Sequence, residues 1–145
     1  MEIQIANTEN NLRECYPAFN ELRPHLSESE FISQAKRQQD NHNYNIVFIK
    51  NDGVVVSAAG YRITEYLAWG KTLYIDDLIT IKSSRKFGYA SSLISYLVKK
   101  AKKENCKELH LDSGTHRHEA HSVYKKHKLN ISSFHFSNEI VKLNA

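Results

Sequence analysis

Apolar residues follow two periodicities along this chain. Alternating or continuous apolar runs predict strands at residues 2–6, 44–50, 54–64, 72–81 and 108–113. Helical spacing predicts helices over residues 12–22, 27–39, 88–104 and 117–126. Residues 131–140 are expected to hold one more strand or two short ones. This order predicts a mixed sheet with helices packed on it, an α/β fold.

Several short motifs refine the element boundaries. Ser27-x-x-Glu30 is a capping box, so Ser27 is expected to open the second helix. Asn51-Asp52-Gly53 is a hairpin signal, and Gly60 predicts a bulge or a close approach within a strand. Pro17 is expected to kink or shorten the first helix, because proline cannot donate a backbone hydrogen bond.

Length and composition indicate one ordinary globular domain over residues 1–145. Hydrophobic residues make up 41% and charged residues 25% of the chain. No apolar run is long enough for a membrane span, and the N-terminal residues lack the pattern of a signal peptide. We therefore expect a cytoplasmic protein with no membrane partner. Cys15 and Cys106 show no metal-type spacing and are expected to be reduced thiols.

The net charge of +4 has a local origin. Lys99, Lys100, Lys102 and Lys103 account for that number, and they lie at the C-terminal end of a predicted helix, where the helix dipole favours cations. No aromatic and basic motif accompanies them, so we expect no nucleic-acid partner. A basic domain nevertheless attracts an anionic cofactor.

A strand, a turn and a helix over residues 73–98 form the most informative segment. The turn holds Arg85-x-x-Gly88-x-Ala90. Such a turn directs unpaired backbone N–H groups and the helix dipole to one point, which suits a phosphate group. The alternative is a plain connection in which Gly88 reverses the chain. We predict that residues 85–91 bind a phosphorylated cofactor.

These residues resemble the acetyl-CoA signature of the GNAT superfamily of N-acetyltransferases, Gln/Arg-x-x-Gly-x-Gly/Ala. A second family signature is similar to Arg117-His-Glu-Ala120-His-Ser-Val-Tyr124, although Lys128-Leu129 stands where the family has Gly-Phe. The resemblance covers nearly the whole chain. It implies a mixed, mostly antiparallel central sheet flanked by helices, with acetyl-CoA as co-substrate.

The resemblance also implies roles for single residues. Backbone groups of Ile79, Thr80 and Ile81 would pair with the pantetheine arm, and Tyr124 would lie near the thioester sulfur. The second signature places Arg117 among the cofactor-binding residues. The pyrophosphate would be held by Arg85, Lys86, Phe87, Gly88, Tyr89, Ala90 and Ser91.

The implied reaction is direct acyl transfer to an amine. Tyr124 is the candidate acid for the departing sulfur, with a core aromatic as the alternative. Asp76 is the candidate base, with a salt bridge or a strand-end cap as the alternative. Strand alternation predicts that Asp76 and Asp77 point to opposite faces. Asp112 is a second, weaker candidate base.

Residues 116–121 contain three histidines, His116, His118 and His121, which invite comparison with a zinc site. The spacing is not HExxH, and no third-ligand pattern is present, so no metal is expected. The histidines and Arg117 could instead bind an acidic or phosphonate-bearing substrate. With His135-Phe136, this stretch is similar to small-molecule acetyltransferases of the aminoalkylphosphonate type.

The acceptor is the open question. Tyr66 and Trp69, in a predicted loop at residues 65–71, could line its pocket, whereas Tyr61 is expected in the core. In the family, the first two helices, here through Arg37, build acceptor specificity. We expect a primary amine of a small molecule; the alternatives are a protein or peptide amine, or a non-catalytic acyl-CoA-binding domain. The resemblance also implies a possible homodimer.

Overall fold

A computed structural model of the chain describes residues 1–144. The chain divides into two compact units, Met1–Leu111 and Asp112–Ala145. The expectation of a single domain over residues 1–145 stays a prediction.

The first unit is built on a five-stranded sheet in the order β1-β2-β3-β4-β5. Neighbouring strands pair antiparallel from β1 to β4, and β5 pairs with β4 in parallel. This confirms the mixed, mostly antiparallel sheet. The strands are β1 (Ile3–Ile5), β2 (Tyr44–Asn51), β3 (Val54–Tyr66), β4 (Gly70–Thr80) and β5 (Glu108–Leu111).

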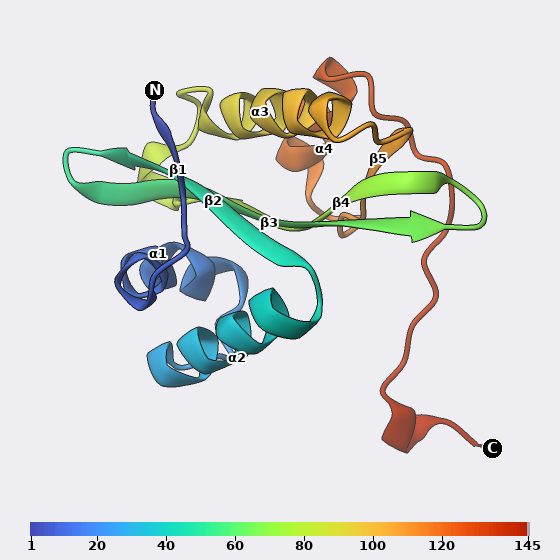
Figure 1. The fold of residues 1–145 in the computed structure, drawn as a ribbon, viewed down its shortest axis with the longest axis horizontal. Coiled ribbons are helices and arrows are strands. Elements are labelled where there is room, and N and C mark those ends of the chain that lie inside the picture. Colours follow the sequence, from blue (N-terminus) through green and yellow to red (C-terminus); the bar gives the residue numbers. More distant parts are fainter. Residues whose placement is uncertain (145) are drawn as a thin grey trace. The chain divides into compact units, whose positions relative to one another are not determined.

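Helices cover both faces of this sheet, with α1 (Glu9–Leu22) and α2 (Glu28–Asn41) on one side and α3 (Tyr89–Lys103) on the other (Figure 1). Strand β2 is therefore apolar on both faces. Ile46 and Phe48 belong to the core under α1 and α2, and Val47 and Ile49 are equally buried. The predicted apolar face of α3 is confirmed by the buried side chains Leu93, Ile94, Leu97 and Ala101.

The helix-start signals are confirmed, but Pro17 has less effect than expected. Ser27 caps α2 with a complete capping box, in which Glu30 returns the hydrogen bond to the Ser27 N–H. Helix α1 continues through Pro17 for its full 14 residues. Its buried face, which includes Leu12 and Phe19, packs on the core, and tertiary packing outweighs the local cost of proline.

The β2–β3 and β3–β4 hairpins both contain residues with backbone in the left-handed region. Asp52 and Gly53 have φ of 49° and 76°, which confirms the predicted turn between β2 and β3. The expected loop at residues 65–71 was too long, because β3 runs to Tyr66 and β4 begins at Gly70, where φ is 70°. Trp69 stacks on His110 with ring centroids 3.7 Å apart, which holds this hairpin against β5.

The second unit contains α4 (His118–Lys126) and a 3₁₀ turn, η2 (Ile140–Lys142). The strand expected within residues 131–140 was wrong, since residues 112–144 contain no strand. Ile131, Phe134 and Phe136 are exposed there. A strand needs a paired neighbour, and this segment has none within its own unit. No helix in the described part of the chain is long and apolar enough to cross a membrane.

Candidate active site

A β-bulge in β4 sets the direction of two acidic side chains. Gly60 pairs with Asp77 and Tyr61 pairs with Ile75, so Asp76 is an extra residue opposite β3. The prediction that Asp76 and Asp77 point to opposite faces was therefore wrong. Both side chains line one pocket. The signal for the bulge was Gly60, the position at which the pairing shifts.

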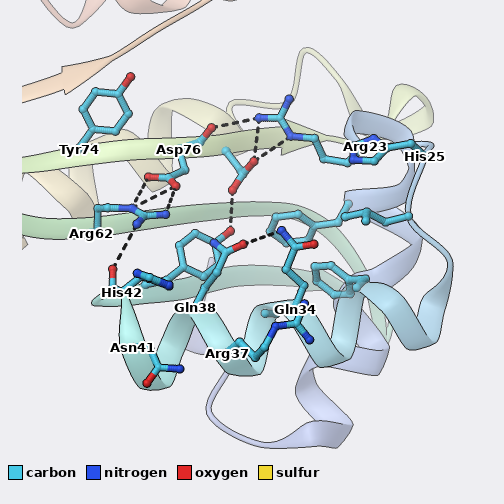
Figure 2. A pocket seen from close by; sticks show the side chains of 16 residues that line it. Arg23, His25, Gln34, Arg37, Gln38, Asn41, His42, Arg62, Tyr74 and Asp76 are labelled. Carbon is cyan, nitrogen blue, oxygen red and sulfur yellow. Dashed lines mark hydrogen bonds and ion pairs between the residues drawn. The ribbon is translucent and has the colours of Figure 1, made fainter. Parts of the chain in front are cut away.

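The pocket has a volume of about 900 Å³ and lies within the first unit, between α2 and the strands β2, β3 and β4 (Figure 2). Apolar side chains such as Phe19 and Phe31 form its floor beside α1 and α2. A strongly polar set completes the lining. Its arginines, histidines and aspartates are Arg23, His25, Arg37, His42, Arg62, Asp76 and Asp77.

Asp76 forms an ion pair with Arg62 on β3. Arg62 Nε donates to the two carboxylate oxygens at 3.0 and 3.1 Å, and Arg62 Nη2 donates to Oδ2 as well. Arg62 Nη1 also donates to the carbonyl oxygen of His42 at 3.3 Å. The hydrogen bond with Asp76 raises the pKa of the Arg62 guanidinium above its ordinary value. The salt-bridge alternative for Asp76 is thus present, and its role as a base stays a prediction.

Asp77 is held from two directions. Arg23 donates to Oδ1 from Nε at 3.0 Å and from Nη2 at 2.8 Å. The Tyr44 hydroxyl donates to Oδ2 at 2.6 Å. Burial raises the pKa of Tyr44 well above its ordinary value, and the charge of Asp77 and the hydrogen bond to it act in the same direction. Tyr44 therefore keeps its phenolic proton at neutral pH, and it lines the pocket as a neutral side chain.

We expect the pairing of Tyr44 with Asp77 to make the protein sensitive to alkali. Because the folded-state pKa of Tyr44 lies above the unfolded value of about 10, its stabilising contribution is complete below pH 10 and is lost as the pH rises through the folded-state pKa. Urea unfolding from pH 7 to 11 should show this fall. Tyr44→Phe should lose about 1–2 kcal/mol at pH 7 and flatten the alkaline fall; an unchanged slope would contradict the assignment.

One edge of β4 continues beyond its neighbour. Strand β5 pairs with β4 only at residues Thr72 to Ile75, so no β5 residue pairs with the stretch from Asp76 to Thr80. The Ile79 carbonyl accepts from Ser57 on β3, and alternation then turns the backbone groups of Leu78 and Thr80 toward the unpaired edge. Both backbone groups of Ile81 are already used, by Val56 and Ser84.

The chain then turns through η1 (Lys82–Ser84) into an exposed loop and α3. Arg85 Nε donates to the Thr80 carbonyl at 3.2 Å, which ties the loop to the end of β4. Gly88 caps α3 in the left-handed region, with φ of 83°, and no side chain caps the helix. The first N–H groups of α3, beginning at Tyr89, therefore lack helical partners. An exposed, positively charged loop with free N–H donors fits a pyrophosphate.

The second unit holds the remaining predicted site residues. Tyr124 lies on α4, and burial raises its pKa above the ordinary value while the charge of Arg117 acts to lower it. The His118 and His121 rings meet edge to face at 5.9 Å, and His121 Nε2 lies 2.9 Å from the Gly114 carbonyl oxygen. Within residues 1–144 no group of three or more His, Cys, Asp or Glu side chains is arranged to hold a metal ion.

Comparison with known proteins fits this architecture. Residues 6–128 match the protein family described as "Acetyltransferase (GNAT) family". The chain belongs to the GNAT acetyltransferase family. It is 26% identical over 111 residues to the uncharacterised N-acetyltransferase YhdJ of Bacillus subtilis (strain 168), covering 77% of this chain and 78% of that one.

Two solved structures share the fold of this GNAT acetyltransferase. A transcriptional regulator from Bacillus halodurans C-125 has a TM-score of 0.82 at 20% identity, covering 96% of this chain and 99% of the other. The aminoglycoside N-acetyltransferase AAC(6')-Iy, in complex with CoA, has a TM-score of 0.81 at 14% identity, covering 96% and 95%. The protein is thus an acyl-transferring enzyme by family.

Sequence reasoning missed three members of the GNAT acetyltransferase pocket, Arg23, Tyr44 and Arg62. Arg23 follows the last residue of α1, and the other two lie on neighbouring strands. Arg62 pairs with Tyr74, two residues before Asp76, so only the register of β3 against β4 brings the ion pair together. Linear spacing carries no signal for such a contact. Tyr61 is buried, as expected.

Proposed function

We propose that this enzyme transfers the acetyl group of acetyl-CoA to a primary amine of a small molecule, by direct attack in a ternary complex. The observation that carries the proposal is the continuity of one stretch of chain. From Asp76 to Ser91 it runs from the pocket, along the unpaired edge of β4, to the exposed loop before α3. The named activity of AAC(6')-Iy, solved with CoA, supports the same co-substrate.

Acetyl-CoA would lie along this stretch. The backbone groups of Leu78 and the N–H of Thr80 would pair with the pantetheine amides as a neighbouring strand would, since the Thr80 carbonyl already accepts from Arg85. Ile79 would shape the same edge, and Ile81 has its own backbone groups already engaged. The pyrophosphate would be held by the residue 85–91 loop with its cations Arg85 and Lys86. A role for Arg117 in cofactor binding stays a prediction.

The chemistry is one substitution at the thioester carbonyl. The neutral amine attacks the carbonyl carbon, the carbon–nitrogen bond forms, and the carbon–sulfur bond breaks. Backbone N–H groups at the β4 edge would stabilise the charge that develops on the carbonyl oxygen. Tyr124 donates its phenolic proton to the departing sulfur, and the products are an acetamide and free CoA thiol.

The amine arrives as an ammonium ion and must lose protons. Asp76 is the proposed acceptor, directly or through a water molecule. Both of its oxygens accept hydrogen bonds from Arg62, so this ion pair must loosen, or relay the proton through water, during each turnover. Asp77 is the structural partner of the pair, because its oxygens are bonded to Arg23 and Tyr44.

The volume of the acceptor pocket supports a small-molecule acceptor. A pocket of about 900 Å³ lies in the size range of small-molecule sites. A protein or peptide amine is the alternative acceptor. A non-catalytic acyl-CoA-binding domain is the remaining alternative. Such a domain would bind CoA, but no amine would cause it to release CoA thiol from acetyl-CoA.

Gly88→Val should weaken CoA binding at least tenfold. Valine at φ of 83° is strained, so the loop would leave the conformation that exposes the α3 N–H groups. Isothermal titration with CoA measures the loss. Gly53→Val is the matched control, because Gly53 also has positive φ (76°) and open space around it, yet lies in the β2–β3 hairpin. If both variants bind CoA as the wild type does, the loop is not the cofactor site.

Assembly and location stay predictions. The exposed apolar side chains of residues 131–143 are of the kind found at protein interfaces and support a homodimer. Size-exclusion chromatography with light scattering would give the mass directly. A cytoplasmic location, without nucleic-acid or membrane partners, is likewise proposed.

A further inference from the structure

The charges that line the acceptor pocket do not cancel. Three arginines and two aspartates face it, so the formal charge is +1 when the histidines are neutral. Protonation of His25 or His42 would only add to the positive charge. A pocket built for a purely cationic acceptor would need the opposite balance, because like charges repel and must both be desolvated.

The pairing within the pocket locates the surplus. Arg62 is paired with Asp76 and Arg23 with Asp77, each through more than one hydrogen bond. Arg37 is the remaining arginine. Its Nη1 donates to the Ser33 hydroxyl at 2.8 Å, and among the described residues it has no acidic partner. The uncompensated cation therefore lies on α2, across the pocket from β4 (Figure 2).

Amide groups surround this cation on the same helix. Gln34, Gln38 and Asn41 also line the pocket (Figure 2). Gln34 and Asn41 lie one helical turn from Arg37 in either direction, and Gln38 lies one turn from each of these two amides. Gln34 Nε2 donates to Gln38 Oε1 at 3.0 Å, which orients the Gln38 amide. The wall formed by α2 thus offers a guanidinium and amide N–H donors, a combination that suits a carboxylate, phosphate or phosphonate.

We propose that the acceptor is a primary amine that also carries an anionic group, and that Arg37 binds this group. This inference rests on the proposed acetyl transfer and adds the acceptor's chemical class. The amine lies toward Asp76 on β4, and the anion lies toward α2. The two internal ion pairs hold Asp76 and Asp77 so that they do not repel an acidic acceptor as free carboxylates would.

The test compares matched amines with the full-length protein. Thiol release from acetyl-CoA is measured with 2-aminoethylphosphonate, β-alanine, ethanolamine and 1,3-diaminopropane, and with kanamycin as a bulky cationic acceptor. At least one acidic amine should exceed ethanolamine at least tenfold in kcat/KM. Arg37→Gln should raise KM for the acidic amine about tenfold more than KM for ethanolamine, since only the acidic amine loses a charged contact.

Lys36→Gln is the matched control. It removes the same charge from the next residue of α2, which lines a different surface with Glu9, and should keep the preference. Transfer to neutral or cationic amines without a preference for acidic ones, or an equal loss for all acceptors in Arg37→Gln, overturns this inference alone. Absence of transfer to every amine, with CoA bound, overturns the proposed function as well.

Discussion

Replacing Tyr124 by phenylalanine is expected to lower kcat about 100-fold. The change removes one hydroxyl and keeps the ring, so the packing of α4 is retained. A positioned general acid contributes on the order of 100- to 10,000-fold to a rate. Without the phenol, CoA thiolate must leave unprotonated or take its proton from water. The measurement is steady-state thiol release with acetyl-CoA and an acceptor both at saturation.

The pH profile distinguishes an acid from a packing residue. Burial raises the pKa of Tyr124 above its ordinary value of about 10. The phenol therefore keeps its proton throughout the neutral range, and wild-type kcat should fall only above pH 10. Tyr124→Phe should lose this alkaline fall together with its rate. Its affinity for CoA should not change, because the lost contact acts only in the transition state.

Tyr96→Phe serves as the matched control for the loss of a phenol. Tyr96 lies on α3, and its removal should leave kcat within about twofold. Thermal unfolding of both variants checks that the fold is intact. If Tyr124→Phe turns over as fast as the wild type, Tyr124 has no part in protonating the thiol.

The elements that local patterns specify were predictable, and those that depend on pairing were not. The capping box at Ser27, the Asp52-Gly53 turn and the left-handed Gly88 each follow from chemistry within a few residues. The segment at residues 131–140 has strand-like alternation only around Phe134 and Phe136, and it lacks a neighbour in its own unit, which a local pattern cannot supply.

The pocket also combines features that local sequence indicates with features that depend on strand pairing. The two acids of β4 are visible in the sequence, but one extra residue at the bulge turns Asp76 to the side of Asp77. That residue also decides which cations the acids meet. Arg62 reaches Asp76 from β3, and Arg23 reaches Asp77 from the end of α1, 54 positions away. Side-chain chemistry was therefore predictable, whereas its partners depended on register.

Replacing Gly60 by alanine is expected to destabilise the protein by about 3 kcal/mol, at the upper end of the cost of overpacking a core. A methyl group at Gly60 would lie 1.9 Å from the Tyr44 hydroxyl oxygen and 2.5 Å from the ring carbon that bears it. Tyr44 is buried and its hydroxyl is bonded to Asp77, so the ring can yield only by breaking that hydrogen bond or by moving into the acceptor pocket that it lines. Urea unfolding at pH 7 measures the loss.

Gly53→Ala makes the same chemical change without the contact. No atom lies within 4 Å of the added carbon there, so only the cost of positive φ remains, about 1 kcal/mol. An equal loss in the two variants would show that Gly60 is not needed for Tyr44 to pack. In folded Gly60→Ala, displaced Tyr44 would also release Asp77, which would leave one acid of the pocket with Arg23 alone. Acetyl transfer should then fall through a raised KM for the acceptor while CoA affinity stays constant, because the bulge that Gly60 permits shapes the acceptor pocket and not the α3 loop.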